Sequence, residues 1–212
     1  MTVKRSVIVG LVALTVIGGA VTAGAQAASA ATTTCGFPCM ALGNSESGGT
    51  DLTAVRNGDA SAGEPVVLSP AAPVPAEDWQ LSLMGSTDDL LAQGLVSAQV
   101  ANLFGGTGYE FQYAPNGVPS GFCLGLHAPA RNNEKVRLVS CTANEKDAIW
   151  VEDAAAQVGR YGPLIPGSET AATPLVLTGD QVGIPLTVAP LSVTSGAVAA
   201  DQMWQAFYGV QS

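Results

Sequence analysis

Short runs of alternating aliphatic residues recur along the chain, separated by stretches rich in Gly, Pro and Asn. Gly63–Pro70 (GEPVVLSP) and Gly183–Pro190 (GIPLTVAP) both fit Gly-x-Pro-aliphatic-x-aliphatic-small-Pro. Lys135–Cys141 (KVRLVSC) takes the corresponding place between them. Such alternation is typical of half-buried strands, so we expect each run to form one strand of a larger β-unit.

A tryptophan follows each run. Trp79 and Trp150 come nine residues after the last residue of their runs, and Trp204 comes fourteen residues after. Each unit thus consists of a strand, a turn-rich stretch, an alternating strand, a loop and a strand entered through Trp. Three such units without a strong helical period predict an all-β fold with pseudo-threefold repeats. The alternative is a chance likeness among segments rich in Val, Leu and Pro.

The units differ in spacing because of one segment between the first and the second. Within Ser82–Gly108, Asp88 and Asp89 stand near the start of a run of apolar and small residues that ends in Gly-Gly. This composition predicts one short helix or an irregular insertion. The expected units are about 41–84, 109–153 and 161–210, with the insertion at about 85–108.

The first thirty residues have the features of a secretory signal peptide. Lys4 and Arg5 precede the run Val7–Ala23, which is apolar or small throughout, and Ala28–Ala30 fits a small-residue cleavage site. We therefore expect 1–30 to be removed and 31–212 to form a single domain. An uncleaved membrane anchor is the alternative, because the apolar run is almost long enough to span a bilayer.

The net charge of the chain restricts the classes of partner that we expect it to bind. Without Lys4 and Arg5, six of the eight basic residues remain against 17 acidic ones, a net charge of −11. Binding to phosphate backbones or anionic lipid calls for basic surfaces. We therefore expect no nucleic-acid partner and, after signal cleavage, no membrane association.

The middle unit carries the most specific motif. It begins with Phe122-Cys123-Leu124, continues with an alternating strand that ends at Cys141, and closes on Trp150. The third unit has a Gln-x-Trp sequence at 202–204, while Glu77 and Ala148 take the Gln place in the other two. The frame resembles the repeat of ricin-type (ricin B-like) β-trefoil lectin domains, in a divergent form of the secreted bacterial type. The resemblance covers roughly 41–210.

The resemblance implies a β-trefoil in which Trp79, Trp150 and Trp204 plug a shared core. It also implies a Cys123–Cys141 bridge, which leaves Cys35 and Cys39 to pair with each other. A redox role for CGFPC is less fitting, because reactive dithiols favour C-x-x-C. A zinc site is less fitting still, because the four thiols lack paired close spacing and the chain has one His.

The same resemblance locates the sugar-binding positions. An active family repeat has an Asp two residues after the first Cys, an aromatic residue two before the second Cys and an Asn three after it. The corresponding residues here are Gly125, Val139 and Asn144, so one of three is retained. Ala54, Leu68 and Pro73 take these places in the first unit. A family-type galactose site is therefore not expected to survive unchanged.

A modified groove is the remaining hypothesis for a binding site. His127, Arg131 and Asn144 are its candidate ligand-binding residues, with Asn132 and Asn133 beside them. The alternative is a solvated hairpin tip, where Asn pairs and charges are common.

The sequence gives little support for catalysis. His127 is the single histidine, so a nucleophilic triad would need it as its base. Phosphate-binding, dinucleotide-binding and calcium-binding motifs are absent from the sequence, and we expect no catalytic residue, cofactor or metal. The expected function is a secreted, non-catalytic module that binds carbohydrate or a cell surface. The alternative is a structural or protein-interaction β-trefoil, such as an inhibitor that presents a loop.

Overall fold

The computed structural model describes residues 39–48, 50–72, 74–141 and 146–208. The expected signal peptide 1–30, Cys35 and Asn144 lie outside the described residues. Among the residues that are described, no helix is both long and apolar enough to cross a bilayer.

The described strands confirm an all-β fold and fall into three consecutive sets of four. The first set is β1 (Met40–Asn44), β2 (Asp51–Val55), β3 (Val66–Pro70) and β4 (Trp79–Ser86). The second is β5 (Thr107–Tyr113), β6 (Phe122–Leu126), β7 (Val136–Ser140) and β8 (Ile149–Glu152). The third is β9 (Leu164–Pro166), β10 (Leu175–Thr178), β11 (Thr187–Pro190) and β14 (Trp204–Tyr208). A small hairpin, β12 (Val193–Thr194) and β13 (Ala197–Val198), precedes β14.

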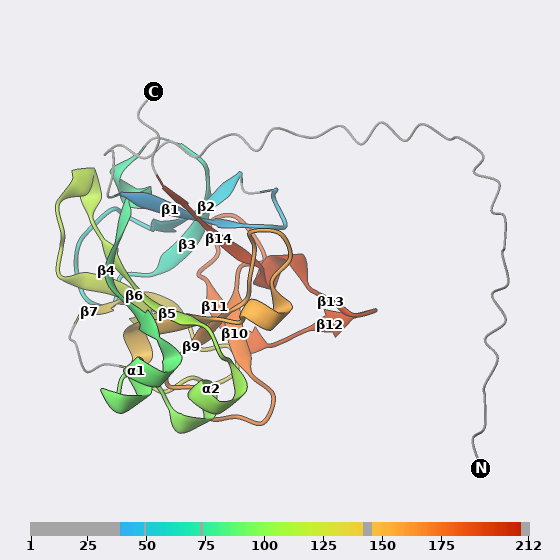
Figure 1. The fold of residues 1–212 in the computed structure, drawn as a ribbon. Coiled ribbons are helices and arrows are strands. Elements are labelled where there is room, and N and C mark those ends of the chain that lie inside the picture. The colour runs from blue at the N-terminus through green and yellow to red at the C-terminus, as the bar shows by residue number, and fades with distance from the viewer. Residues whose placement is uncertain (1–38, 49, 73, 142–145, 209–212) are drawn as a thin grey trace, which may run out of the picture.

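The first and fourth strands of each set form an antiparallel ring, which we call the barrel (Figure 1). Its order is β14, β1, β4, β5, β8 and β9. Gly162, just before β9, closes the ring on β14. Its N–H donates to the Trp204 carbonyl at 3.0 Å, and the Trp204 N–H donates back to the Gly162 carbonyl at 2.9 Å. Closure removes the free sheet edges that favour aggregation.

The second and third strands of each set form hairpins that contact one another through isolated bridges. The bridged pairs are Pro65 with Arg137, Lys135 with Thr187, and Val67 with Pro185. The threefold relation is clearest at three turn residues of positive φ, Gly63 (85°), Asn133 (65°) and Gly183 (78°). Their N–H groups donate to the carbonyls of Leu138, Val188 and Leu68 respectively, each at 2.8 Å. Asn133 takes the place of Gly because Asn tolerates the left-handed region better than other side chains.

The three tryptophans lie together in the core. Trp79, Trp150 and Trp204 are 1%, 0% and 2% exposed and belong to one hydrophobic cluster. Each indole N–H donates to a backbone carbonyl 26 or 27 residues upstream. The acceptors are Thr53 at 3.1 Å, Leu124 at 2.8 Å and Leu177 at 2.8 Å, all in the second strand of their set. Buried indoles need such a partner, and here it joins the second strand of each set to the fourth.

A 3-10 helix precedes each Trp strand: η1 (Pro75–Glu77), η3 (Lys146–Ala148) and η5 (Ala200–Gln202). Their last residues are those that the sequence places at the Gln position of Gln-x-Trp. Gln202 Oε1 accepts from the Ser192 N–H at 2.7 Å, and Glu77 Oε2 accepts from the Ala72 N–H at 3.0 Å. Ser192 and Ala72 each stand two residues after the Pro that ends their run, so Glu77 makes the same contact as Gln202. Two further 3-10 helices are η2 (Pro115–Gly117) and η4 (Ala154–Ala156).

The insertion contains two short helices, α1 (Thr87–Ala92) and α2 (Ala98–Leu103), which confirms its short-helical character. The hydroxyls of Ser86 and Ser97 cap their first turns by accepting backbone N–H bonds. Both helices pack against β-strands through a second hydrophobic cluster. The members of that cluster are Leu90, Leu95, Val96, Val100, Phe104, Ile149, Val151, Ile165 and Val176.

Candidate functional site

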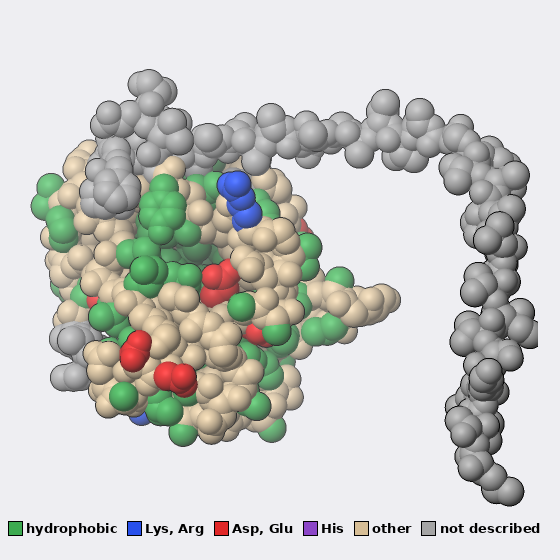
Figure 2. All heavy atoms as spheres, in the orientation of Figure 1, with side chains coloured by type: hydrophobic (Ala, Val, Ile, Leu, Met, Phe, Trp, Pro, Cys, Tyr) green, Lys and Arg blue, Asp and Glu red, His purple; other side chains and the backbone are tan. Residues whose placement is uncertain are grey.

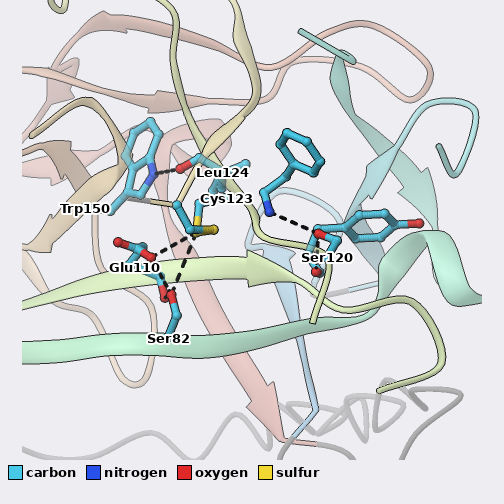
Figure 3. Close-up of a disulfide and its surroundings, with 9 residues drawn as sticks. Ser82, Glu110, Ser120, Cys123, Leu124 and Trp150 are labelled. Carbon is cyan, nitrogen blue, oxygen red and sulfur yellow. Dashed lines mark hydrogen bonds between the residues drawn. A yellow bond between two sulfur atoms is a disulfide. The ribbon is translucent and has the colours of Figure 1, made fainter. Parts of the chain in front are cut away.

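The Cys123–Cys141 disulfide organises the second set of strands (Figure 3). It joins β6 to the residue after β7 across a sequence separation of 18, as the family resemblance implies. Behind it, the buried Glu110 accepts a hydrogen bond from the Ser82 hydroxyl at 2.6 Å, and its Oε1 lies 3.1 Å from Cys123 Sγ. Cys39 is also disulfide-bonded, and Cys35 lies outside the described residues.

Glu110 and the two cysteines are also the one group of potential metal ligands that the described residues bring together. Zinc and other soft metals bind cysteine as the thiolate. Both sulfurs are bonded to each other here, so neither supplies a thiolate. The group is therefore a structural cluster, in which Glu110 and Cys123 are buried and Cys141 is half-buried.

A cavity of about 540 Å³ lies beside the β6–β7 hairpin. Its lining comes from the ends of β6 and β7, from η3 and from the turn before β3. The lining residues are Ala62, Gly63, Leu126, His127, Leu138, Val139, Ser140 and Asp147. His127 and Ser140 are exposed, while Asp147 is half-buried. The cavity thus combines an apolar wall with an imidazole, a hydroxyl and a carboxylate.

Asp147 has one oxygen in an unusual position. Its Oδ1 is buried and has no hydrogen-bond partner within the part of the chain that the structure describes. A buried acceptor without a donor costs free energy, so such groups in folded proteins call for an explanation. Because this oxygen is closed off from solvent, a ligand that enters the cavity could contact the carboxylate only through its other oxygen.

Two of the family's three sugar-binding positions, Gly125 and Val139, are filled by packing. A Cβ on Gly125 would lie 2.5 Å from Val139 Cγ2 and 2.8 Å from the Asp147 carbonyl oxygen. Val139 itself is 8% exposed, and Asn144 lies outside the described residues. A side chain at 125 would have to displace backbone as well as Val139, so an Asp there has no room.

The structure places the remaining candidate residues of the hairpin in different surroundings. His127 lines the cavity, whereas Arg131 does not. Arg131 Nε donates to Glu134 Oε2 at 2.8 Å in an exposed ion pair at the hairpin tip. Asn133 lies in a turn, and its backbone N–H donates to the Val188 carbonyl of the neighbouring hairpin. Sequence reasoning missed Asp147 and Ser140, because no spacing rule distinguishes them from other polar loop residues.

Comparison with known proteins bears on the fold. Neither the models of protein families nor the curated proteins yield a match to this chain. Solved structures do: the designed threefold-symmetric protein ThreeFoil is similar with a TM-score of 0.54 and 16% identity, over 80% of this chain and 97% of that one. The agglutinin of Rhizoctonia solani is similar with a TM-score of 0.52 and 14% identity, over 82% and 94%.

A third similar structure is an exo-β-1,3-galactanase from Clostridium thermocellum, with a TM-score of 0.54 and 12% identity. The match covers 80% of this chain and 30% of that chain. Neighbours of this kind, together with the three sets of strands, show the architecture. The chain has a β-trefoil fold, as its resemblance to ricin-type lectin domains implies.

Proposed function

We propose that the chain is a secreted, non-catalytic module that binds carbohydrate. The β-trefoil fold supports this proposal, and so does the similarity to an agglutinin. Fold alone does not carry function, so the proposal needs a site. That site is the cavity beside His127.

The observation that carries the proposal is the carboxylate of Asp147. Carboxylates accept strong hydrogen bonds from hydroxyls, and Asp147 is one of the residues that line the cavity. His127 and Ser140 flank the same cavity and supply further donors and acceptors. Asp147 thus offers the acceptor that Gly125 does not.

The affinity expected of this site is modest. The faces of Trp, Tyr and Phe contribute to carbohydrate binding through stacking, and none of these is among the described residues that line this cavity. Its apolar wall comes from Leu126, Leu138 and Val139 instead. Recognition would therefore depend on hydrogen bonds, each worth about 0.5–1.5 kcal/mol net. This favours low affinity for one sugar unit and tighter binding to repeated glycans.

A glycan array probed with the secreted protein tests the proposal. We expect binding that free sugar reverses and that Asp147→Asn and His127→Ala both weaken. Arg131→Ala is the matched control, because Arg131 is on the same hairpin and does not line the cavity. A protein that binds no glycan, or one whose binding depends on none of the cavity residues, would refute the proposal.

Secretion has its own test. We propose that residues 1–30 direct export and are removed, because their charge and apolar pattern fit a signal peptide. The intact mass of protein recovered from the medium should correspond to a chain that starts at Ala31. Protein found in the membrane fraction, with a mass that retains Lys4 and Arg5, would favour the membrane-anchor alternative.

The β12–β13 hairpin supports a second candidate, a protein-interaction module that presents a loop. Figure 1 shows this hairpin projecting from the body of the fold. Val193 is 55% exposed, and Ser195 at its tip has a φ of 55°. Cross-linking from the hairpin to a partner protein, with glycan arrays negative, would favour this candidate. Replacing 193–198 with a short Gly-containing turn should leave glycan binding intact if the first proposal is right.

A further inference from the structure

A second cavity of about 350 Å³ lies at one end of the barrel, which we call the barrel mouth. All six barrel strands contribute to it. The lining residues are Leu42, Leu81, Tyr109, Phe111, Glu152, Gln157, Arg160, Leu164, Trp204, Gln205, Ala206 and Tyr208. Figure 2 shows hydrophobic side chains gathered around a hollow over β14 and β5, with acidic and basic side chains at its edge. The barrel mouth shares no lining residue with the cavity beside His127.

The wall of the barrel mouth is aromatic and aliphatic. The rings of Tyr109 and Phe111 are stacked, with centroids 5.8 Å apart and planes 24° from parallel. Leu42, Leu164 and Trp204 are buried, as Phe111 is, and line the same space. Such a volume and lining are typical of sites for small molecules with an apolar body.

A carboxylate stands at the edge of this apolar space. Glu152 Oε1 accepts from Gln157 Nε2 at 3.2 Å, and Oε2 accepts from the Tyr109 hydroxyl at 3.4 Å. Two long hydrogen bonds leave acceptor capacity on a group that has about four lone-pair sites. Burial raises the pKa of Glu152 above its ordinary value, since the surrounding apolar groups disfavour the charged form.

We propose that the barrel mouth binds a small uncharged amphiphile, whose apolar body packs on Tyr109 and Phe111 and whose hydroxylated head donates to Glu152. The apolar wall selects the body, and the carboxylate selects the hydrogen-bond donor. Arg160 and Glu152 have opposite charges and both line the site, so a charged head of either sign is repelled by one of them as well as attracted by the other, and it also loses hydration against the apolar wall. An uncharged hydroxyl-bearing head meets neither penalty.

The test uses octyl glucoside below its micelle concentration as the probe. Octylamine and octanoate carry the same chain with a charged head, and glucose carries the head without the chain. Titrations of the ¹⁵N-labelled protein should show octyl glucoside shifting amides of β5, β8 and β14. Octylamine, octanoate and glucose should each bind at least tenfold more weakly.

Three variants and one control test whether octyl glucoside binds in the barrel mouth. Ala206→Leu narrows the cavity and should weaken octyl glucoside binding more than tenfold, whereas Ala189→Leu makes the same change on β11, away from the cavity, and should not. Glu152→Gln retains the shape with a weaker acceptor and should cost about fivefold. Tyr109→Phe keeps the stacked ring and should change the affinity by less than the Glu152 variant does.

The outcome separates this site from the proposed glycan site. His127→Ala should leave octyl glucoside binding unchanged, because the two cavities share no residue. Absence of binding by octyl glucoside, shifts confined to the β6–β7 hairpin, or insensitivity to both Ala206→Leu and Glu152→Gln would overturn the inference. Tighter binding of either charged probe would also overturn it.

Discussion

The indole N–H of Trp150 donates to the carbonyl of Leu124 at 2.8 Å, and this bond has a counterpart in each of the other two sets of strands. Each counterpart spans nearly the same sequence distance, 26 residues for Trp79 and 27 for Trp204. The relation makes each tryptophan a tie between the second and fourth strands of its set. All three rings belong to one hydrophobic cluster.

Replacing any of these tryptophans by Phe should destabilise the fold by a similar amount. Each change removes ring volume from a buried site and leaves a carbonyl without its donor. We expect a loss of about 2–4 kcal/mol per variant. Urea unfolding followed by far-UV circular dichroism measures it, with the exposed Tyr208→Phe as the control. A variant within about 0.5 kcal/mol of the parent would place its indole outside the shared core.

Glu77→Gln should raise stability at neutral pH. Glu77 is 1% exposed, and burial raises its pKa above the ordinary value. A carboxyl with a raised folded-state pKa stabilises the fold fully below its unfolded pKa, and this contribution is lost as the pH rises through the folded value. Gln keeps an acceptor for the Ala72 N–H without the charge. We expect a gain on the order of 1 kcal/mol at pH 7 that disappears below about pH 4.

The measurement is the unfolding free energy of parent and variant from pH 3 to 8. Gln202→Glu is the reciprocal change, since Gln202 makes the matching contact to Ser192. The Gln202→Glu protein should have a lower unfolding free energy than the parent at pH 7, and this difference should also disappear at low pH. A pH-independent difference between Glu77→Gln and the parent would show that the carboxyl is not desolvated in the folded state.

Gly125→Asp, which restores the residue of an active family repeat, should not create a sugar site. The new side chain would meet Val139 Cγ2 and the Asp147 carbonyl at less than van der Waals distance. We expect a loss of about 1–3 kcal/mol and no gain in galactose binding. Gly105→Asp is the matched control, because a Cβ at Gly105 meets no atom within 4 Å. Galactose binding by a stably folded Gly125→Asp protein would contradict the packing seen here.

Asn133 should tolerate Gly and resist Ala. Its φ of 65° lies in the left-handed region, where the equivalent residues of the other hairpins are Gly63 and Gly183. Asn133→Ala should cost about 1 kcal/mol, and Asn133→Gly should be close to neutral. The neighbouring Asn132→Ala lacks this constraint and controls for the loss of the amide. Equal effects of Ala at 132 and 133 would argue against a left-handed turn.

Removing the disulfide should weaken the fold without changing its form. The Cys123–Cys141 bridge closes a loop with a sequence separation of 18, worth about 3 kcal/mol in the chain-entropy account. Cys123→Ala with Cys141→Ala should therefore lower the urea midpoint while the circular dichroism spectrum of the folded protein is retained. Loss of the folded spectrum in the absence of urea would assign the bridge a larger role than loop closure.

The sequence predicted the frame of this fold better than its site. Equal spacing from the alternating runs to Trp79 and Trp150 predicted the threefold architecture, because core positions constrain residue type strongly. The second helix of the insertion was not foreseen, since a six-residue helix carries little periodic signal and depends on packing against residues such as Ile149. Similarly, the equivalence of Asn133 with two glycines becomes visible once backbone angles are known.

The candidate sites depend on contacts between distant segments. Ala62 and Asp147 are far apart in the sequence and line the same cavity, and no local pattern connects them. The barrel mouth draws residues from β1 to β14, so its aromatic pair and Glu152 meet through closure of the ring. Sequence reasoning identified His127 as a candidate because it is one of several polar residues on the hairpin loop of the second unit. Cavities that form between repeats leave no motif in the sequence.

Exchange of the three indole N–H protons with solvent deuterium, followed by NMR, tests the central claim most directly. If every tryptophan ties its unit to one shared core, the three protons should exchange slowly and with a common opening free energy, close to that of global unfolding. The contradicting result is one indole proton that exchanges within the dead time of the measurement while the other two stay protected. The tryptophan of that unit would then lie outside the shared core.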